Sequence, residues 1–194
     1  MFTGIVESVG QILNVNSEGT NKHFHIASDL SCELKVDQSV SHEGVCLTVT
    51  KCNESGHWVT AIDETLKKSN LGNWTIGKSV NLERCMKADG RFDGHIVQGH
   101  VDTIAQVLDI QLQNGSWLFT FKVKATDLIV EKGSVCLNGT SLTCFNVSQD
   151  TFSVAIIPYT FEHTTFGKLA VGDPVNIEFD ILGKYIQKIM SKMN

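Results

Sequence analysis

Two related stretches, Gly44-Val45-Cys46-Leu47-Thr48 and Gly139-Thr140-Ser141-Leu142-Thr143, decide the fold of this chain. Each stretch follows a turn signal and then alternates between apolar and polar residues, which is the pattern of a strand with one buried face. Glycine, leucine and threonine recur at matching places, so they belong to a repeated scaffold. The two stretches differ at Cys46 and Ser141, and we interpret this difference as a sign of chemistry.

The repeat extends far beyond these two stretches. Residues 4–13 match residues 99–108, at an offset of 95 positions (99 − 4 = 95). Residues 80–83 match residues 175–178 at the same offset. A constant offset over about 80 residues indicates duplication of one folding unit.

Both units are predicted to be all-β, because short runs rich in Val, Ile and Thr are separated by turn signals such as Asn138-Gly139. A small open sheet would expose its edges, so we predict two tandem six-stranded Greek-key barrels, with an open sandwich as the alternative. We expect the first barrel at 1–88, the second at 89–181 and a C-terminal α-helix at 182–194.

Each unit also contains one short predicted helix, which begins near a capping threonine and stops at a glycine in the left-handed conformation. The helices and their signals are residues 64–71 with Thr65 and Gly72, and residues 161–166 with Thr160 and Gly167.

The tail carries an apolar stripe at helical spacing, with lysines and polar residues between its members. The duplicated units do not need such a stripe, so a helix that joins subunits is favoured over one packed on its own barrel. The stripe consists of Leu182, Tyr185, Ile186, Ile189, Met190 and Met193.

The composition argues against several kinds of partner. A net charge of −5 without a long Lys/Arg run argues against nucleic acid. The start of the chain lacks the features of a signal peptide and no stretch is long enough to span a membrane, so we expect a cytoplasmic protein. The six cysteines show no zinc-site spacing and are interpreted as reduced thiols.

The histidines do not predict a metal site. His95 and His100 are five residues apart, which places them on opposite faces of a strand, and no third ligand is near. His23, His25 and His57 are interpreted as surface residues. The chain also lacks a phosphate loop, a nucleophile elbow and a Rossmann fingerprint.

Four pairs of matching positions differ in chemical character: Cys46 matches Ser141, Glu43 matches Asn138, Ile5 matches His100, and Cys85 matches Asp180. With a reference pKa of about 8.5, Cys46 is mostly a thiol at neutral pH, and taken alone it would be structural. Ser141 lies beside Thr143 on one strand face and is able to bind a ligand or position a water. Asp180 ends a strand, where an aspartate forms a turn or acts as a base.

Several stretches resemble the riboflavin synthase family of duplicated lumazine-binding barrels. They are Met1-Phe2-Thr3-Gly4-Ile5-Val6-Glu7, Gly94-His95-Ile96-Val97-Gln98-Gly99-His100-Val101-Asp102, and the paired Cys46-Leu47-Thr48 and Ser141-Leu142-Thr143. The resemblance covers essentially the whole chain. It implies a homotrimer of two-barrel subunits, joined through C-terminal helices, that uses neither a metal nor an organic cofactor.

The resemblance also implies a reaction. Family members take two molecules of 6,7-dimethyl-8-ribityllumazine and move a four-carbon unit from one to the other, giving riboflavin and 5-amino-6-ribitylamino-uracil. The active site is expected between the N-terminal barrel of one subunit and the C-terminal barrel of its neighbour. The nucleophile stays open between Cys46, a water bound by Ser141 and a group of the ring. An association with lumazine synthase and the barrel that holds the donor also stay open.

Carried over by position, the resemblance implies three sets of residues. The positions linked to turnover are Phe2, Ser39, Cys46, His100, Ser141 and Asp180. The first substrate pocket is expected to use Gly4, Ile5, Val6, Cys46, Leu47, Thr48, Thr60, Ala61, Ile62, Asp63, Glu64 and Thr65, with Gly99, His100 and Val101 close by. The second is expected to use Ser141, Leu142, Thr143, Ile157, Pro158, Tyr159, Thr160, Phe161 and Glu162, with Lys132 reaching across.

One departure from the family pattern concerns Glu43, where the family usually has Asn, as the second unit does at Asn138. We expect it to place a charge near the first pocket. A non-catalytic lumazine or flavin carrier is the main alternative function, but related carriers show erosion of one pocket motif, and both motifs are intact here. A purely structural barrel protein is the third reading.

Overall fold

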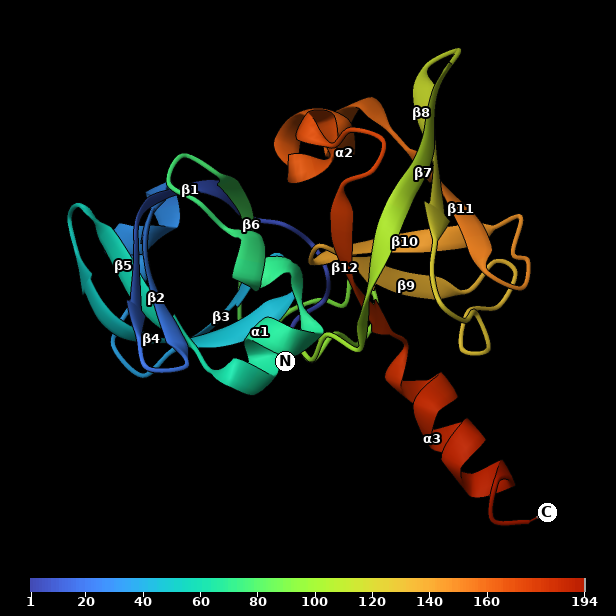
Figure 1. Ribbon diagram of the computed structural model, residues 1–194, viewed down its shortest axis with the longest axis horizontal. Coiled ribbons are helices and arrows are strands. Elements are labelled where there is room, and N and C mark those ends of the chain that lie inside the picture. Colours follow the sequence, from blue (N-terminus) through green and yellow to red (C-terminus); the bar gives the residue numbers. More distant parts are fainter. Residues whose placement is uncertain (194) are drawn as a thin grey trace.

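The computed structural model describes residues 1–193. Over this range the chain forms two closed antiparallel barrels of six strands each, followed by a C-terminal helix (Figure 1). The predicted tandem barrels are therefore confirmed. Because both sheets close on themselves, the alternative of an open sandwich is wrong.

The two barrels have the same strand order. The first, in the order β1-β2-β5-β4-β3-β6, consists of β1 Ser8–Glu18, β2 Asn21–Ala27, β3 Ser39–His42, β4 Val45–Asn53, β5 Gly56–Ala61 and β6 Ser79–Arg84. The second, in the order β7-β8-β11-β10-β9-β12, consists of β7 Thr103–Gln113, β8 Ser116–Lys122, β9 Ser134–Leu137, β10 Thr140–Phe145, β11 Thr151–Ile156 and β12 Pro174–Phe179. The helices are α1 Asp63–Lys68, α2 Pro158–His163 and α3 Ile181–Met190, with short 3-10 helices at Asp29–Glu33, Asn70–Asn73 and Thr165–Lys168.

The duplication holds at the level of individual strand pairs. Ser39 lies opposite Thr48 in the first barrel, and Ser134 lies opposite Thr143 in the second, each 95 positions later (134 − 39 = 95). The alternation predicted for β4 is also confirmed, because its apolar residues are buried while Cys46 is half-buried. One strand face therefore builds the core and the other is free for ligands.

The two short helices begin and end earlier in the chain than predicted. The helix α1 ends before Ser69, whose hydroxyl accepts a hydrogen bond from the Leu71 N–H and caps the following 3-10 helix. Thr164 and Phe166 repeat this arrangement after α2. A hydroxyl that bonds to the local backbone competes with continuation of the helix, which explains the early stop. The predicted caps and stops are wrong: Thr65 and Thr160 lie inside the α-helices, and Gly72 and Gly167 lie in the 3-10 helices without positive φ.

His57 is not a surface residue, contrary to the prediction. Its side chain is fully buried inside the first barrel, where its Nε2 lies 2.8 Å from His42 Nε2 and its Nδ1 lies 2.9 Å from Ser31 Oγ. Burial lowers the pKa of His57 to about 4, so the ring is neutral at neutral pH.

The barrels meet through a polar interface that repeats itself across the duplication. The Asn81 side chain donates to the Asn138 carbonyl at 2.9 Å, and the Asn176 side chain donates to the Glu43 carbonyl at the same distance. Gly44 and Gly139 lie so close that a Cβ on either would be 2.8 Å from the other's backbone nitrogen. Each turn thus rests on its counterpart.

Glu43 belongs to this interface, and the expectation that it lies near the first pocket is wrong. Its side chain is buried and accepts a hydrogen bond of 2.8 Å from the Asn81 N–H, as the Asn138 side chain does from the Asn176 N–H. Burial raises the pKa of Glu43 from 4.5 to about 7, against the opposing effects of Asn81 and Lys78.

We expect Glu43→Asn to stabilise the protein in a pH-dependent way. Because the folded pKa of Glu43 is raised, the unfolded chain ionises first, and stability falls as the pH rises from about 4.5 to about 7. At pH 8 the ionised Glu43 carboxylate lowers the free energy of unfolding by at most about 3 kcal/mol. Denaturant unfolding should therefore show that Glu43→Asn has a higher free energy of unfolding than the unaltered protein at pH 8. This difference should shrink towards pH 4.5. Asn138→Glu is the matched control and should lose stability at pH 8; a gain independent of pH would contradict this account.

Candidate active site

Two extended arms cross between the barrels, one at residues 2–4 and the other at residues 95–99. They pair with each other through Phe2 and Val97, which exchange backbone hydrogen bonds of 2.7 and 3.1 Å. The buried Glu83 and Glu178 carboxylates, each on the last strand of its barrel, accept backbone N–H groups of the arm from the same unit. These bonds oppose the rise in the pKa of both carboxyls that burial causes.

Each arm then reaches the chemistry-bearing strand of the opposite barrel. The Gly4 carbonyl accepts a hydrogen bond of 2.7 Å from the Ser141 N–H, and the Gly99 carbonyl accepts one of 2.8 Å from the Cys46 N–H. Both glycines have positive φ, and a Cβ at either would lie within 2.7 Å of the Cβ of the residue it faces. The arms therefore need glycine at these points.

A first cavity of about 230 Å³ opens beside Cys46. Six of the predicted site residues line it, together with three of their neighbours in the chain. Its lining residues are Val45, Cys46, Glu64, Thr65, Lys68, Ser69, Gly99, His100 and Val101. The first cavity is thus built by the first barrel and closed by an arm of the second.

A second cavity of about 390 Å³ occupies the equivalent place beside Ser141. The Lys132 ammonium lies over the Phe145 ring, 5.1 Å from its centre. The residues that line this second cavity are Lys132, Ser141, Leu142, Thr143, Phe145, Ala155, Ile157 and Thr160. Ser141 and Thr143 point to one side of β10, as the alternation predicted.

The surroundings of Cys46 favour a neutral thiol. Burial raises the pKa of Cys46, and a hydrogen bond with the Ser39 side chain acts in the opposite direction. Phe2, Val97 and Cys136 form a small buried cluster against which Cys46 packs. Cys46 therefore serves better as a hydrogen-bonding group than as a thiolate nucleophile.

The surroundings of Ser141 include an imidazole. The His95 Nδ1 lies 2.6 Å from the Ser141 Oγ, and the charge of Asp180 acts on the same ring. Burial lowers the pKa of His95, which Asp180 opposes. The Asp180 carboxylate also accepts a hydrogen bond of 3.0 Å from the Leu182 N–H and so caps α3.

The two cavities bring together fewer than half of the predicted site residues, and the others lie elsewhere. Gly4 lies against Ser141 and not, as expected, at the first pocket. Phe2 is fully buried, and the Leu47 and Ala61 side chains face the barrel core. Several predicted residues line neither cavity: Ile5, Val6, Thr48, Thr60, Ile62, Asp63, Pro158, Tyr159, Phe161 and Glu162.

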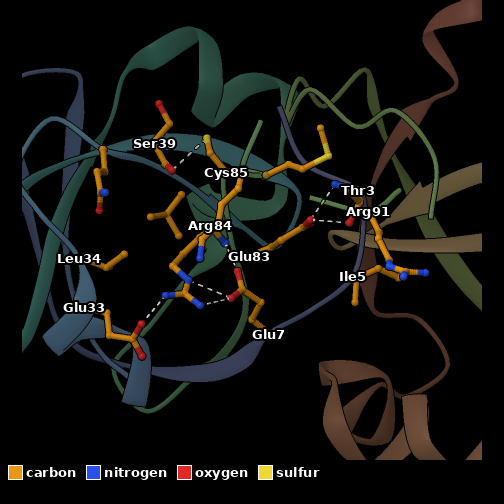
Figure 2. A pocket seen from close by; sticks show the side chains of 14 residues that line it. Thr3, Ile5, Glu7, Glu33, Leu34, Ser39, Glu83, Arg84, Cys85 and Arg91 are labelled. Atoms are coloured by element: carbon orange, nitrogen blue, oxygen red, sulfur yellow. Dashed lines mark hydrogen bonds and ion pairs between the residues drawn. The ribbon is translucent and has the colours of Figure 1, made fainter. Parts of the chain in front are cut away.

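Ser39 and Ile5 line a third cavity of about 400 Å³ between the first barrel and the connecting segment, shown in Figure 2. The Arg84 guanidinium lies there between the Glu7 and Glu33 carboxylates, which raise its pKa. The Cys85 thiol approaches the Ser39 carbonyl at 3.3 Å. Because the Glu7 and Glu33 carboxylates are paired with Arg84 within the chain, we interpret the charged residues of this cavity as a structural ion-pair cluster.

Sequence reasoning missed His95, which was considered only as a metal ligand, and the lining residues Val45, Lys68, Ser69, Phe145 and Ala155. The repeat offset contains a signal for Ala155, since it matches the predicted residue Thr60 (155 − 60 = 95). Within residues 1–193, no group of three or more His, Cys, Asp or Glu residues is placed to hold a metal ion.

The C-terminal helix leads away from both barrels (Figure 1). It spans Ile181–Met190, while Asn194 of the predicted helical segment lies outside the described residues. The side chains of its apolar stripe are each at least 58% exposed, so it does not pack on its own barrel. Over residues 1–193, none of the helices has the length and apolar character that crossing a bilayer requires.

Comparison with known proteins agrees with this geometry. The Lumazine binding domain family matches residues 3–85 and again residues 98–180. Two barrels with equivalent cavities thus define a duplicated lumazine-binding-domain protein.

Relatives that match over their full length show to which family of lumazine-binding proteins the chain belongs. Riboflavin synthase from Bacillus subtilis (strain 168) is 37% identical over 100% of this chain and 92% of its own length. Riboflavin synthase from Saccharomyces cerevisiae is 38% identical over 97% of this chain and 85% of its own length. The chain belongs to the riboflavin synthase family.

Solved structures share the fold at lower identity. LumP complexed with riboflavin is 22% identical, with a TM-score of 0.85 over 92% of this chain and 99% of that chain. LumP complexed with 6,7-dimethyl-8-(1'-D-ribityl) lumazine is 20% identical, with a TM-score of 0.84 over 92% of this chain and 98% of that chain. At this identity the likeness establishes the common fold.

We expect Gly99→Ala to destabilise the protein by about 2–4 kcal/mol, from strain at positive φ and from the clash with Cys46. Gly77→Ala is the matched control, because φ is similar (+89° against +80°) but no atom lies within 4 Å of the new Cβ. It should cost only about 1–2 kcal/mol, the strain alone. Equal losses in denaturant unfolding would mean that the close approach of the arm to Cys46 is not required.

Proposed function

We propose that the chain converts two molecules of 6,7-dimethyl-8-ribityllumazine into riboflavin and 5-amino-6-ribitylamino-uracil by transfer of a four-carbon unit. The observation that carries this proposal is the pair of equivalent cavities with unlike groups, Cys46 in one and Ser141 in the other. Two identical substrates need two similar sites, and different roles as donor and acceptor need different residues. Relatives named riboflavin synthase over the full chain support the proposal.

The residues suit the chemistry of this reaction. The methyl group at C7 of one ring must lose a proton, and a nucleophile must add at C7 of the other. The resulting anionic ring needs hydrogen-bond donors, which backbone N–H groups and the Thr65, Thr143 and Thr160 hydroxyls are able to supply. Holding two rings in reactive geometry lowers the barrier by several kcal/mol.

We also propose that the active enzyme is a homotrimer, in which the first cavity of one chain faces the second cavity of its neighbour. The exposed stripe of α3 supports a helical contact between copies. The Asp102 carboxylate and the Lys184 ammonium, 2.5 Å apart, fix the start of α3 to the second barrel and so give the helix a defined direction.

The domain boundary near residue 88 and the cytoplasmic location stay predictions.

Incubation of the purified protein with 6,7-dimethyl-8-ribityllumazine alone, in EDTA, tests the function. We expect one riboflavin for every two lumazine molecules consumed, followed by absorbance. Tight stoichiometric binding without conversion would instead identify a lumazine carrier. Absence of both binding and conversion would leave a structural barrel protein.

The trimer is tested by Ile186→Lys, which places a charge in the apolar stripe of α3. By light scattering we expect the unaltered protein to have the mass of three 21.3 kDa chains, about 64 kDa, and the variant to have that of one chain. Lys188→Ser, on the same helix but outside the stripe, should keep the larger mass. A single-chain mass for the unaltered protein would contradict the trimer.

A further inference from the structure

The core of the first barrel contains a line of polar side chains. The His42 and His57 rings are fully buried, and their Nε2 atoms lie 2.8 Å apart. His57 Nδ1 lies 2.9 Å from Ser31 Oγ, which in turn lies 3.0 Å from Ser28 Oγ. At the other end of the line, His42 Nδ1 lies 3.0 Å from the Val40 carbonyl oxygen. The line therefore joins the first 3-10 helix to β5 and β3.

The carbonyl at one end gives every hydrogen bond in this line a direction. A carbonyl oxygen only accepts, so His42 Nδ1 carries a hydrogen and donates it to Val40. A neutral His42 ring then has its lone pair on Nε2, where it accepts from the His57 Nε2–H. His57 Nδ1 is left as the acceptor for the Ser31 hydroxyl, which accepts in turn from Ser28. The tautomers of both neutral rings thus follow from the geometry.

The second barrel has no counterpart to this pair of histidines. At the repeat offset, His42 corresponds to Leu137 (42 + 95 = 137) and His57 corresponds to Phe152 (57 + 95 = 152), and both are fully buried apolar side chains. The barrel scaffold accepts apolar residues at these two positions, so the fold itself does not require imidazoles there. The pair therefore gives the first barrel a property that the second lacks.

We propose that His42 and His57 form an acid-sensitive lock, which ties β3 to β5 across the first barrel while both rings are neutral and releases them when the rings take up protons. A single proton would reverse the hydrogen bonds between the rings and the serines, and would leave a charge in the barrel core. A second proton would turn two N–H groups towards each other across 2.8 Å. β3 pairs with β4 through Ser41 and Cys46, so the lock supports the strand beside the first cavity.

The surroundings of the pair offer no carboxylate to neutralise such a charge. Within residues 1–193, neither ring is ion-paired. Burial lowers the pKa of both rings, to about 4 for His57; His57 acts in the same direction on His42, and His25 on β2 does so on His57. Glu43, next to His42, is turned to the interface between the barrels. The other charged or titratable side chains on β2, β4, β6 and the first 3-10 helix, which pack against the pair, are exposed or bonded elsewhere: Lys22, His23, Asp29, Cys32, Glu33, Lys51, Cys52, Glu83 and Arg84.

The double variant His42→Leu/His57→Phe tests the lock, because it gives the first barrel the side chains that the second barrel has. The unfolded rings take up protons below about pH 6.5, whereas the folded His57 ring does so only near pH 4, so stability is lost as the pH falls through this window. Each ring changes the folding equilibrium constant by up to about tenfold per pH unit. From pH 6 to pH 5 we expect this constant, measured by denaturant unfolding, to fall about 50-fold further in the unaltered protein than in the double variant.

Two comparisons isolate the pair from other titrating groups. Glu43 titrates in part of the same range with the opposite sign, but it is present in both proteins and its effect cancels. His163→Leu, which removes an exposed histidine of α2, is the control and should keep the pH dependence of the unaltered protein. An equal fall in the unaltered protein and the double variant would overturn the proposal.

The hydrogen-bond chain is also observable without substitution, by 15N–1H NMR correlations of the histidine side chains at pH 7.5. We expect His42 to carry its hydrogen on Nδ1 and His57 to carry its hydrogen on Nε2. A hydrogen on Nε2 of His42, or a charge on either ring at this pH, would overturn the inference even if the double variant fails to fold. Neither measurement needs the substrate, so the lock and the proposed function succeed or fail separately.

Discussion

The reciprocal crossing of the two arms is the constraint on which the rest of the structure depends. Gly4 binds the backbone of Ser141 and Gly99 binds that of Cys46, so the strand beside each cavity is held by the arm of the opposite unit. The crossing requires glycine at each close contact and a buried carboxylate, Glu83 or Glu178, to hold each arm. Each carboxylate thus holds the arm of its own unit, and that arm then binds the strand of the opposite barrel.

The scaffold repeats between the two halves, whereas the chemical groups beside the cavities do not. The strand pairs, the arms and the glycine contacts repeat 95 residues apart, whereas the groups beside Cys46 and Ser141 differ. Glu43 is an exception within the scaffold, since it places a carboxyl where the second unit has the neutral Asn138. The raised pKa of Glu43 reflects this break in the symmetry.

The barrels, their duplication and the outward direction of Cys46 were predictable, because strand alternation and a constant offset are local signals. The crossing was not, since an offset shows which residues correspond but not which barrel they touch; this is why Gly4 was assigned to the wrong pocket. Glu43 was misplaced for the same reason.

His57 shares strand parity with Val59 and Ala61, so its burial was signalled, but its polarity suggested a surface position. His95 carried no local signal, because its contact with Ser141 joins residues that are 46 positions apart.

The central claim is that one chain holds two related ligand sites of unequal chemistry. Titration calorimetry with a lumazine derivative that lacks the C7 methyl group measures this most directly, because such a ligand has no C7 methyl proton to lose and binds without reacting. The account predicts two ligands bound per chain, with different affinities. A single ligand per chain would contradict it, because one of the two cavities would then have no role in binding.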